Sequence, residues 1–275
     1  MNTNSITPKA LKEANDFRDE CDAIYELVAT LTDAQLKTST LFKSWSINDI
    51  LAHLHIWNIA AQLTLTDPDG FVQFGAFAMG HIAKGESHIE MQNTYLEGLK
   101  GQALVKAWRD YYNPMADNFL SANPQARLKW VGPDMSARSC IIARQMEHWA
   151  HAQAIFDVLG VERKNTARLK NIAHIGVTTY SWSFKVNNLE PLLPKPFIQL
   201  KAPGGDIWEW NEPQDDNSVK GSATEFCQVV TQCRNIADTT IETIGENAAA
   251  WMSIAQCFAG GPETPPAPGT RNIAK

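Results

Sequence analysis

Two stretches of the sequence carry histidine and glutamate although they contain almost no other charge. The residues are His53, His55, Glu147, His148 and His151. Both stretches are otherwise apolar and are expected to be helical. Ionisable groups on apolar helices cost free energy unless they are paired or bind a metal. Their presence is therefore the first indication of a functional site.

Glu147 and His151 are four residues apart. On a helix this spacing places both side chains on one face, with about 5–6 Å between their Cβ atoms. A carboxylate oxygen and an imidazole nitrogen placed in this way can reach one divalent ion at about 2.0–2.2 Å. One more ligand from a facing helix would leave a coordination position open, as a catalytic metal requires.

The third ligand is either His53 or His55. Two residues on a helix differ by about 200° around its axis, so only one of the two histidines can face the same site. The apolar stripe of this helix does not decide between them. A second alternative is that Glu147 forms an ion pair with Arg144, three residues earlier on the same face, and binds no metal.

The elements that would position these residues are helices in the first 160 residues. Apolar residues spaced by three and four predict helices over about 8–31, 47–64, 86–119 and 136–159. Ser46-Ile-Asn-Asp49 resembles a capping box at the start of the second helix, and the third is expected to break near residues 98–101. Asp67-Pro-Asp-Gly70 is typical of a turn. Residues 1–160 are therefore predicted to form a four-helix bundle.

The second half of the chain is predicted to be a small α+β domain, residues 161–275, with a tail rich in Pro and Gly. Its expected strands cover residues 178–186, 197–201, 207–210 and 218–221, and its expected helices cover 223–242 and 246–258. The polar and basic segment 162–170 marks the linker. The predicted fold class is thus α+β in two domains.

Two motifs resemble a known family. The segment Trp45-Ser-Ile-Asn-Asp-Ile-Leu-Ala-His53-Leu and the segment Arg144-Gln-Met-Glu147-His-Trp-Ala-His151 are similar to the second-helix and fourth-helix motifs of the DinB-like superfamily. The closer resemblance is to the metal-binding domain of mycothiol-dependent maleylpyruvate isomerases. This resemblance implies that His53, Glu147 and His151 bind one divalent metal, usually taken to be Zn²⁺, and that a low-molecular-weight thiol is a candidate cofactor.

The C-terminal region resembles a different group. Residues 222–235 and 251–262 are similar to an uncharacterised bacterial subfamily whose C-terminal region is sometimes labelled wyosine-base-formation-like. The isomerases carry an arginine near the C-terminus that points to the active site, whereas the corresponding stretch here is Ala-Gly-Gly-Pro. Arg234 is the candidate substitute, and a salt bridge is the alternative role for this residue.

Composition limits the partners. The sequence has 24 Lys and Arg against 30 Asp and Glu, a net charge of −6, and this acidic balance argues against nucleic acid as a partner. No apolar run reaches the roughly 18 residues that span a bilayer, and no secretory signal pattern is present, so a cytoplasmic protein without a membrane partner is expected. The five cysteines form no C-x-x-C pair. Oligomeric state stays open, a homodimer being one of the states considered.

The expected function is a metal-dependent isomerase or transferase that acts on a small-molecule substrate and uses a thiol cofactor. The alternative from another class is a non-catalytic binding or sensor module that the metal stabilises.

Overall fold

The computed structural model describes residues 10–271, and these residues form a mixed α+β structure, which confirms the predicted fold class. The chain divides into two compact units. The first contains the described residues through Ser39 together with Trp45–His148, and the second contains Thr40–Ser44 and the described residues from Trp149 onward. One helix continues across this division, so the domain boundary expected at residue 160 stays a prediction.

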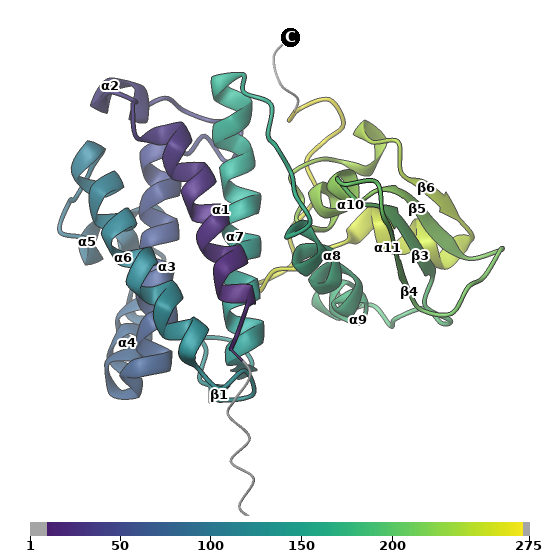
Figure 1. Cartoon of the computed structure of the whole chain (residues 1–275), viewed down its shortest axis with the longest axis horizontal. Helices are drawn as coiled ribbons and strands as arrows, with labels where there is room; N and C mark the ends of the chain where they lie inside the picture. Colours follow the sequence, from purple (N-terminus) through teal and green to yellow (C-terminus); the bar gives the residue numbers. More distant parts are fainter. Residues whose placement is uncertain (1–9, 272–275) are drawn as a thin grey trace, which may run out of the picture. The chain divides into compact units, whose positions relative to one another are not determined.

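The first unit is helical (Figure 1). Its helices are α1 (Glu13–Val28), α2 (Asp33–Leu36), α3 (Ile47–Thr66), α4 (Pro68–Ala83), α5 (His88–Tyr95), α6 (Gly101–Ser121) and the first part of α7 (Ala137–Leu159). A short antiparallel pair, β1 (Arg127–Leu128) and β2 (Met135–Ser136), precedes α7. The helices expected over 8–31, 47–64 and 136–159 correspond to α1, α3 and α7, although residues 8 and 9 lie outside the described part of the chain.

Helix α3 is the central element of this unit and contacts α4, α5 and α6. It begins at a capping box, in which the Ser46 hydroxyl accepts a hydrogen bond from the Asp49 N–H and the Asp49 carboxylate accepts one from the Ser46 N–H. Side chains are buried on all sides of α3, including Leu54, Ile56 and Ala60. A helix with buried side chains on all sides must be enclosed by other elements. This enclosure holds the His53 side chain in the interior of the unit.

One expectation for the first unit is corrected. Asp67-Pro-Asp-Gly70 is not an isolated turn, because it begins helix α4: the Asp67 carboxylate accepts a hydrogen bond from the Gly70 N–H at 3.0 Å, and Pro68 occupies the first helical position. The break expected near residues 98–101 of the helical stretch 86–119 is present, because helices α5 and α6 are separated by residues 96–100. None of the helices in the described part of the chain is long and apolar enough to span a bilayer.

The second unit contains a four-stranded sheet and short helices. Its elements are α8 (Leu169–Thr178), α9 (Tyr180–Val186), β3 (Phe197–Lys201), β4 (Ile207–Trp210), β5 (Ser218–Ser222), α10 (Ala223–Val230), the 3₁₀ turn η1 (Ile236–Asp238), β6 (Glu242–Ile244) and α11 (Glu246–Ile254). The strand order is β4-β3-β5-β6, in which β3 and β5 are parallel and the other neighbours are antiparallel.

One face of this sheet packs against helices and the other does not (Figure 1). Ile198, Leu200 and Val219 are fully buried, while Gln199, Lys201 and Lys220 alternate with them and are polar. Gly176 on α8 permits the close approach of α10, because a Cβ at this position would lie 2.8 Å from a methyl group of Val230. The core of the unit therefore lies between the sheet and α8 and α10.

Three element assignments in this unit were wrong. The strand expected over 178–186 is helix α9, in which Tyr180, Ser183 and Phe184 are buried at spacings of three and four residues, so burial on a helical face outweighs β-propensity. The helix expected over 223–242 ends at Val230 and is followed by η1 and β6. The last helix ends at Ile254, four residues earlier than expected.

Candidate metal centre

His53, Glu147 and His151 come together in the structure. One ligand atom from each, an imidazole nitrogen or a carboxylate oxygen, lies within 4.8 Å of the others. His53 projects from α3, and the other two residues project from α7, one turn apart. The choice between His53 and His55 that periodicity left open is therefore made by the packing of α3 against its neighbours.

Aromatic rings surround His53, which is buried. The ring of Trp45 lies 5.3 Å from the His53 ring, and the ring of Trp57 lies at 6.3 Å, both measured between centroids. A second imidazole, that of His88 at the start of α5, lies at 6.2 Å. His88 was not identified from the sequence, because no spacing relates it to the other histidines. These rings restrict the access of water to one side of the cluster.

Arg144, three residues before Glu147 on α7, connects α7 to α3 beside the cluster of His53, Glu147 and His151. Its guanidinium is buried and donates hydrogen bonds to the Asn58 side-chain oxygen at 3.2 Å and to the Leu54 carbonyl at 3.3 Å. Burial lowers the pKa of Arg144 from its ordinary value, and the negative charge of Glu147 opposes this shift. Arg144 therefore reaches across to the neighbouring helix in addition to acting electrostatically on Glu147.

His148 belongs to this connection and not to the cluster. Its Nδ1 lies 2.7 Å from the carbonyl of Arg144, so Nδ1 donates and Nε2 accepts. Nε2 receives the Trp108 indole N–H at 3.4 Å and the Asn58 amide at 3.3 Å. A fully buried imidazole whose two ring nitrogens both form hydrogen bonds has a structural role between the helices.

His55 lies on another side of α3, where its ring packs edge-on against Tyr111 at 5.4 Å. The residue is buried, and burial lowers the pKa of His55 to about 4. The unfolded chain, with a pKa near 6.5 at this position, binds more protons than the folded chain between these two values. Stability should therefore rise with pH across this window and level off above it.

We expect the His55→Phe variant to lose this contribution. The difference in free energy of unfolding between the wild type and the variant should change by about 3 kcal/mol between pH 4 and pH 7. Urea titrations at half-unit pH intervals would measure it. If the free energy of unfolding depends on pH in the same way in both proteins, the pKa of His55 is not lowered and the side chain is not buried.

The donor set fits a divalent metal. Two ligand atoms that bind one Zn²⁺ at about 2.0–2.2 Å are separated by at most about 4.4 Å, the sum of the two bonds. The atoms of His53, Glu147 and His151 lie within 4.8 Å of each other, so small side-chain rotations bring them into range. Two nitrogens and one carboxylate oxygen are also a set that Zn²⁺ accepts.

Phe42 and Arg271 lie in the same unit as His151. The ring of Phe42 contacts the His151 ring edge-on at 4.9 Å between centroids. The guanidinium carbon of Arg271 lies 5.2 Å from the centroid of Phe42, and Arg271 donates a hydrogen bond to the Gln232 carbonyl at 2.8 Å. Sequence reasoning missed Arg271, because the Pro- and Gly-rich segment before it contains no periodic pattern that would position it.

Arg234 forms a buried ion pair. Its Nη2 lies 2.7 Å from Oδ1 of Asp157, with only 9% and 8% of the two side chains exposed. Nη1 donates to the carbonyl of Cys233 at 2.9 Å. Both ends of the guanidinium are therefore engaged in structural contacts, and the catalytic role considered for Arg234 stays a prediction.

Comparisons with known proteins assign the chain to a family. Residues 17–156 match the family described as the mycothiol maleylpyruvate isomerase N-terminal domain. The chain belongs to this family. Uncharacterised proteins of two Mycobacterium tuberculosis strains, CDC 1551 / Oshkosh and H37Rv, are each 36% identical over 248 residues, which covers 90% of this chain and 95% of the relative.

Two solved structures also align with the chain. A crystal structure of the mycothiol-dependent maleylpyruvate isomerase and one of its histidine-to-alanine mutant align with 15% and 14% identity and TM-scores of 0.49 and 0.50. Each alignment covers 79% of this chain and 87% of the other. The family match contains His53, Glu147 and His151, whereas the sheet of the second unit lies outside it.

Proposed function

We propose that this protein is a metal-dependent enzyme that acts on a small molecule with a low-molecular-weight thiol as cofactor, and that His53, Glu147 and His151 bind the metal. The observation that carries the proposal is the convergence of these three side chains from two helices. Membership of the mycothiol maleylpyruvate isomerase N-terminal domain family supports the thiol and the isomerase or transferase class.

The residues around the cluster have distinct tasks in this proposal. A Zn²⁺ ion held there supplies Lewis acidity and lowers the pKa of a coordinated thiol or water. Trp45 and Trp57 exclude water from the His53 side of the cluster. Arg144 fixes α7 against α3 and keeps a positive charge near Glu147.

The positive charge of Arg271 favours the binding of an anionic substrate. It brings a permanent positive charge to Phe42, whose ring contacts His151, and a guanidinium binds carboxylates through paired hydrogen bonds. We expect Arg271→Met to raise KM for an anionic substrate about tenfold or more while metal content stays unchanged, and Arg271→Lys to recover part of this loss. Steady-state kinetics on the zinc-loaded variants would test it. Equal KM values in the wild type and Arg271→Met would remove Arg271 from substrate binding.

The experiment that tests the function combines the metal with the thiol. Zinc-loaded protein is incubated with maleylpyruvate and either mycothiol, glutathione or no thiol, and isomerisation is followed spectrophotometrically. We expect turnover that requires a thiol and that is lost in Glu147→Gln. If the protein binds metal but shows neither turnover nor a thiol-dependent change in the absorption spectrum of its Co²⁺ form, the proposal is wrong and the non-catalytic module is favoured.

A further inference from the structure

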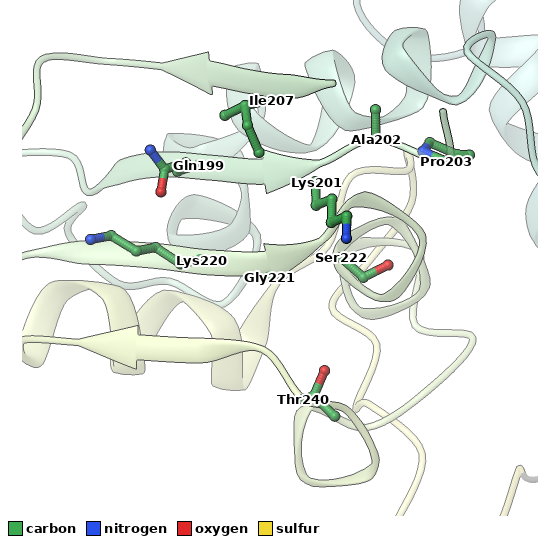
Figure 2. A pocket seen from close by; sticks show the side chains of 9 residues that line it. All are labelled: Gln199, Lys201, Ala202, Pro203, Ile207, Lys220, Gly221, Ser222 and Thr240. Atoms are coloured by element: carbon green, nitrogen blue, oxygen red, sulfur yellow. The ribbon is translucent and has the colours of Figure 1, made fainter. Parts of the chain in front are cut away.

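A hollow lies on the side of the C-terminal sheet that the helices leave uncovered. Its volume is about 470 Å³, and polar side chains from β3 and β5 and from the loop before β6 line it, with Ile207 and Pro203 as apolar wall (Figure 2). It shares no residue with the candidate metal centre. A hollow of this size is suited to a small organic molecule.

The pairing of β3 with β5 places the polar side chains of the two strands next to each other. In the parallel pair, Lys201 of β3 is the partner of Ser222 of β5, and Gln199 is the partner of Lys220. Figure 2 shows the Lys201 ammonium close to the Ser222 side chain, where the two strands end and α10 begins. Carboxyl ends of parallel strands are a common place for ligands, because side chains from adjacent strands converge there.

The hydrogen bonds already present determine what the hollow still offers. The Ser222 oxygen accepts a bond from the Thr224 N–H at 3.2 Å, which leaves the hydroxyl proton of Ser222 to donate. Gln199 donates to Glu209 at 2.7 Å and so offers its carbonyl oxygen as an acceptor. Thr240 likewise donates to a nearby glutamate, Glu225, at 2.7 Å and offers its lone pairs.

Both lysines lack an acidic partner within ion-pair distance among the described residues. Glu242 faces Lys220 across β5 and β6 as its register partner, and no ion pair joins the two side chains. The carboxylates of Glu209 and Glu225 are engaged by Gln199 and Thr240. Two ammonium groups that line one hollow without a carboxylate bound to either favour an anion in it.

We propose that this pocket binds a small organic anion. Lys201, Lys220 and the Ser222 hydroxyl hold a phosphate or carboxylate group, and hydroxyl groups elsewhere on the ligand donate to Gln199 and Thr240. The ligand is therefore a phosphorylated or carboxylated molecule that carries hydroxyl groups, and the pocket is a second site independent of the metal centre.

Amide-resolved NMR of the full-length protein tests this proposal. Inorganic phosphate and succinate are titrated separately, with sodium chloride at matched ionic strength as reference. Each titration uses the wild type and the double variant Glu147→Gln/His151→Ala. The double variant lacks two of the proposed metal ligands, so its signals cannot arise from an anion that binds to a metal there. We expect the Ser222 and Thr240 amide signals to shift saturably in both proteins with at least one of the two anions. Lys201→Gln and Lys220→Gln should each weaken binding about tenfold, since each removes one charge-assisted hydrogen bond to the anion.

The control is Lys185→Gln, an exposed lysine on α9 outside the pocket, which should bind like the wild type. Saturation by phosphate alone identifies a phosphorylated ligand, and saturation by succinate alone identifies a carboxylate. The proposal is overturned if chloride produces the same shifts, if neither anion saturates, or if Lys185→Gln weakens binding as much as Lys201→Gln. Because the double variant carries no metal site, none of these results depends on the proposed function.

Discussion

Arg144→Met is expected to lower the free energy of unfolding by about 3 kcal/mol or more. Methionine fills a similar volume, so the loss reflects polar groups and not a cavity. The Leu54 carbonyl and the Asn58 side-chain oxygen would each lose a buried donor. Glu147 would lose a neighbouring positive charge. Urea denaturation followed by circular dichroism measures the change.

The matched control is Arg138→Met on the same helix. Arg138 is half exposed and pairs with Glu13 at 3.2 Å. An exposed ion pair of this kind contributes about 0–1 kcal/mol. If Arg144→Met proves no more destabilising than Arg138→Met, Arg144 does not connect α7 to α3, and the positioning of Glu147 needs another explanation.

Zinc binding should raise the melting temperature of the wild type and leave that of His151→Ala unchanged. A ligand at 100 times its dissociation constant adds about 2.7 kcal/mol to the free energy of unfolding. Thermal unfolding with and without ZnCl₂, and after treatment with a chelator, measures this effect. His174→Ala, which removes an exposed histidine from α8, should keep the full zinc response. A zinc response retained by His151→Ala would place the stabilising ion elsewhere.

The sequence predicted those elements whose local pattern agrees with their final burial. Strands β3 and β4 were predicted with the observed bounds, because two short runs rich in apolar and aromatic residues lie on either side of the turn residues Gly204 and Gly205. Helix α9 was predicted as a strand because aromatic and β-branched residues follow one another there. Only packing shows that Tyr180 and Phe184 are buried together on one helical face.

The candidate site shows the same limit. The spacing of Glu147 and His151 indicates a pair on one helical face, but the third ligand depends on which side of α3 faces α7. His53 and His55 have equivalent local patterns, and only tertiary packing separates them. Arg271 could not be predicted, because its position next to Phe42 joins segments more than 200 residues apart in the sequence.

The metal content of the purified protein shows directly whether His53, Glu147 and His151 bind one ion. Elemental analysis of the wild type, His53→Ala, Glu147→Gln, His151→Ala and the matched His55→Phe variant is compared after identical zinc loading and desalting. We expect one zinc ion per chain in the wild type and in His55→Phe, and almost none in the other three. Full occupancy in any of those three variants, or loss of zinc in His55→Phe, would contradict it.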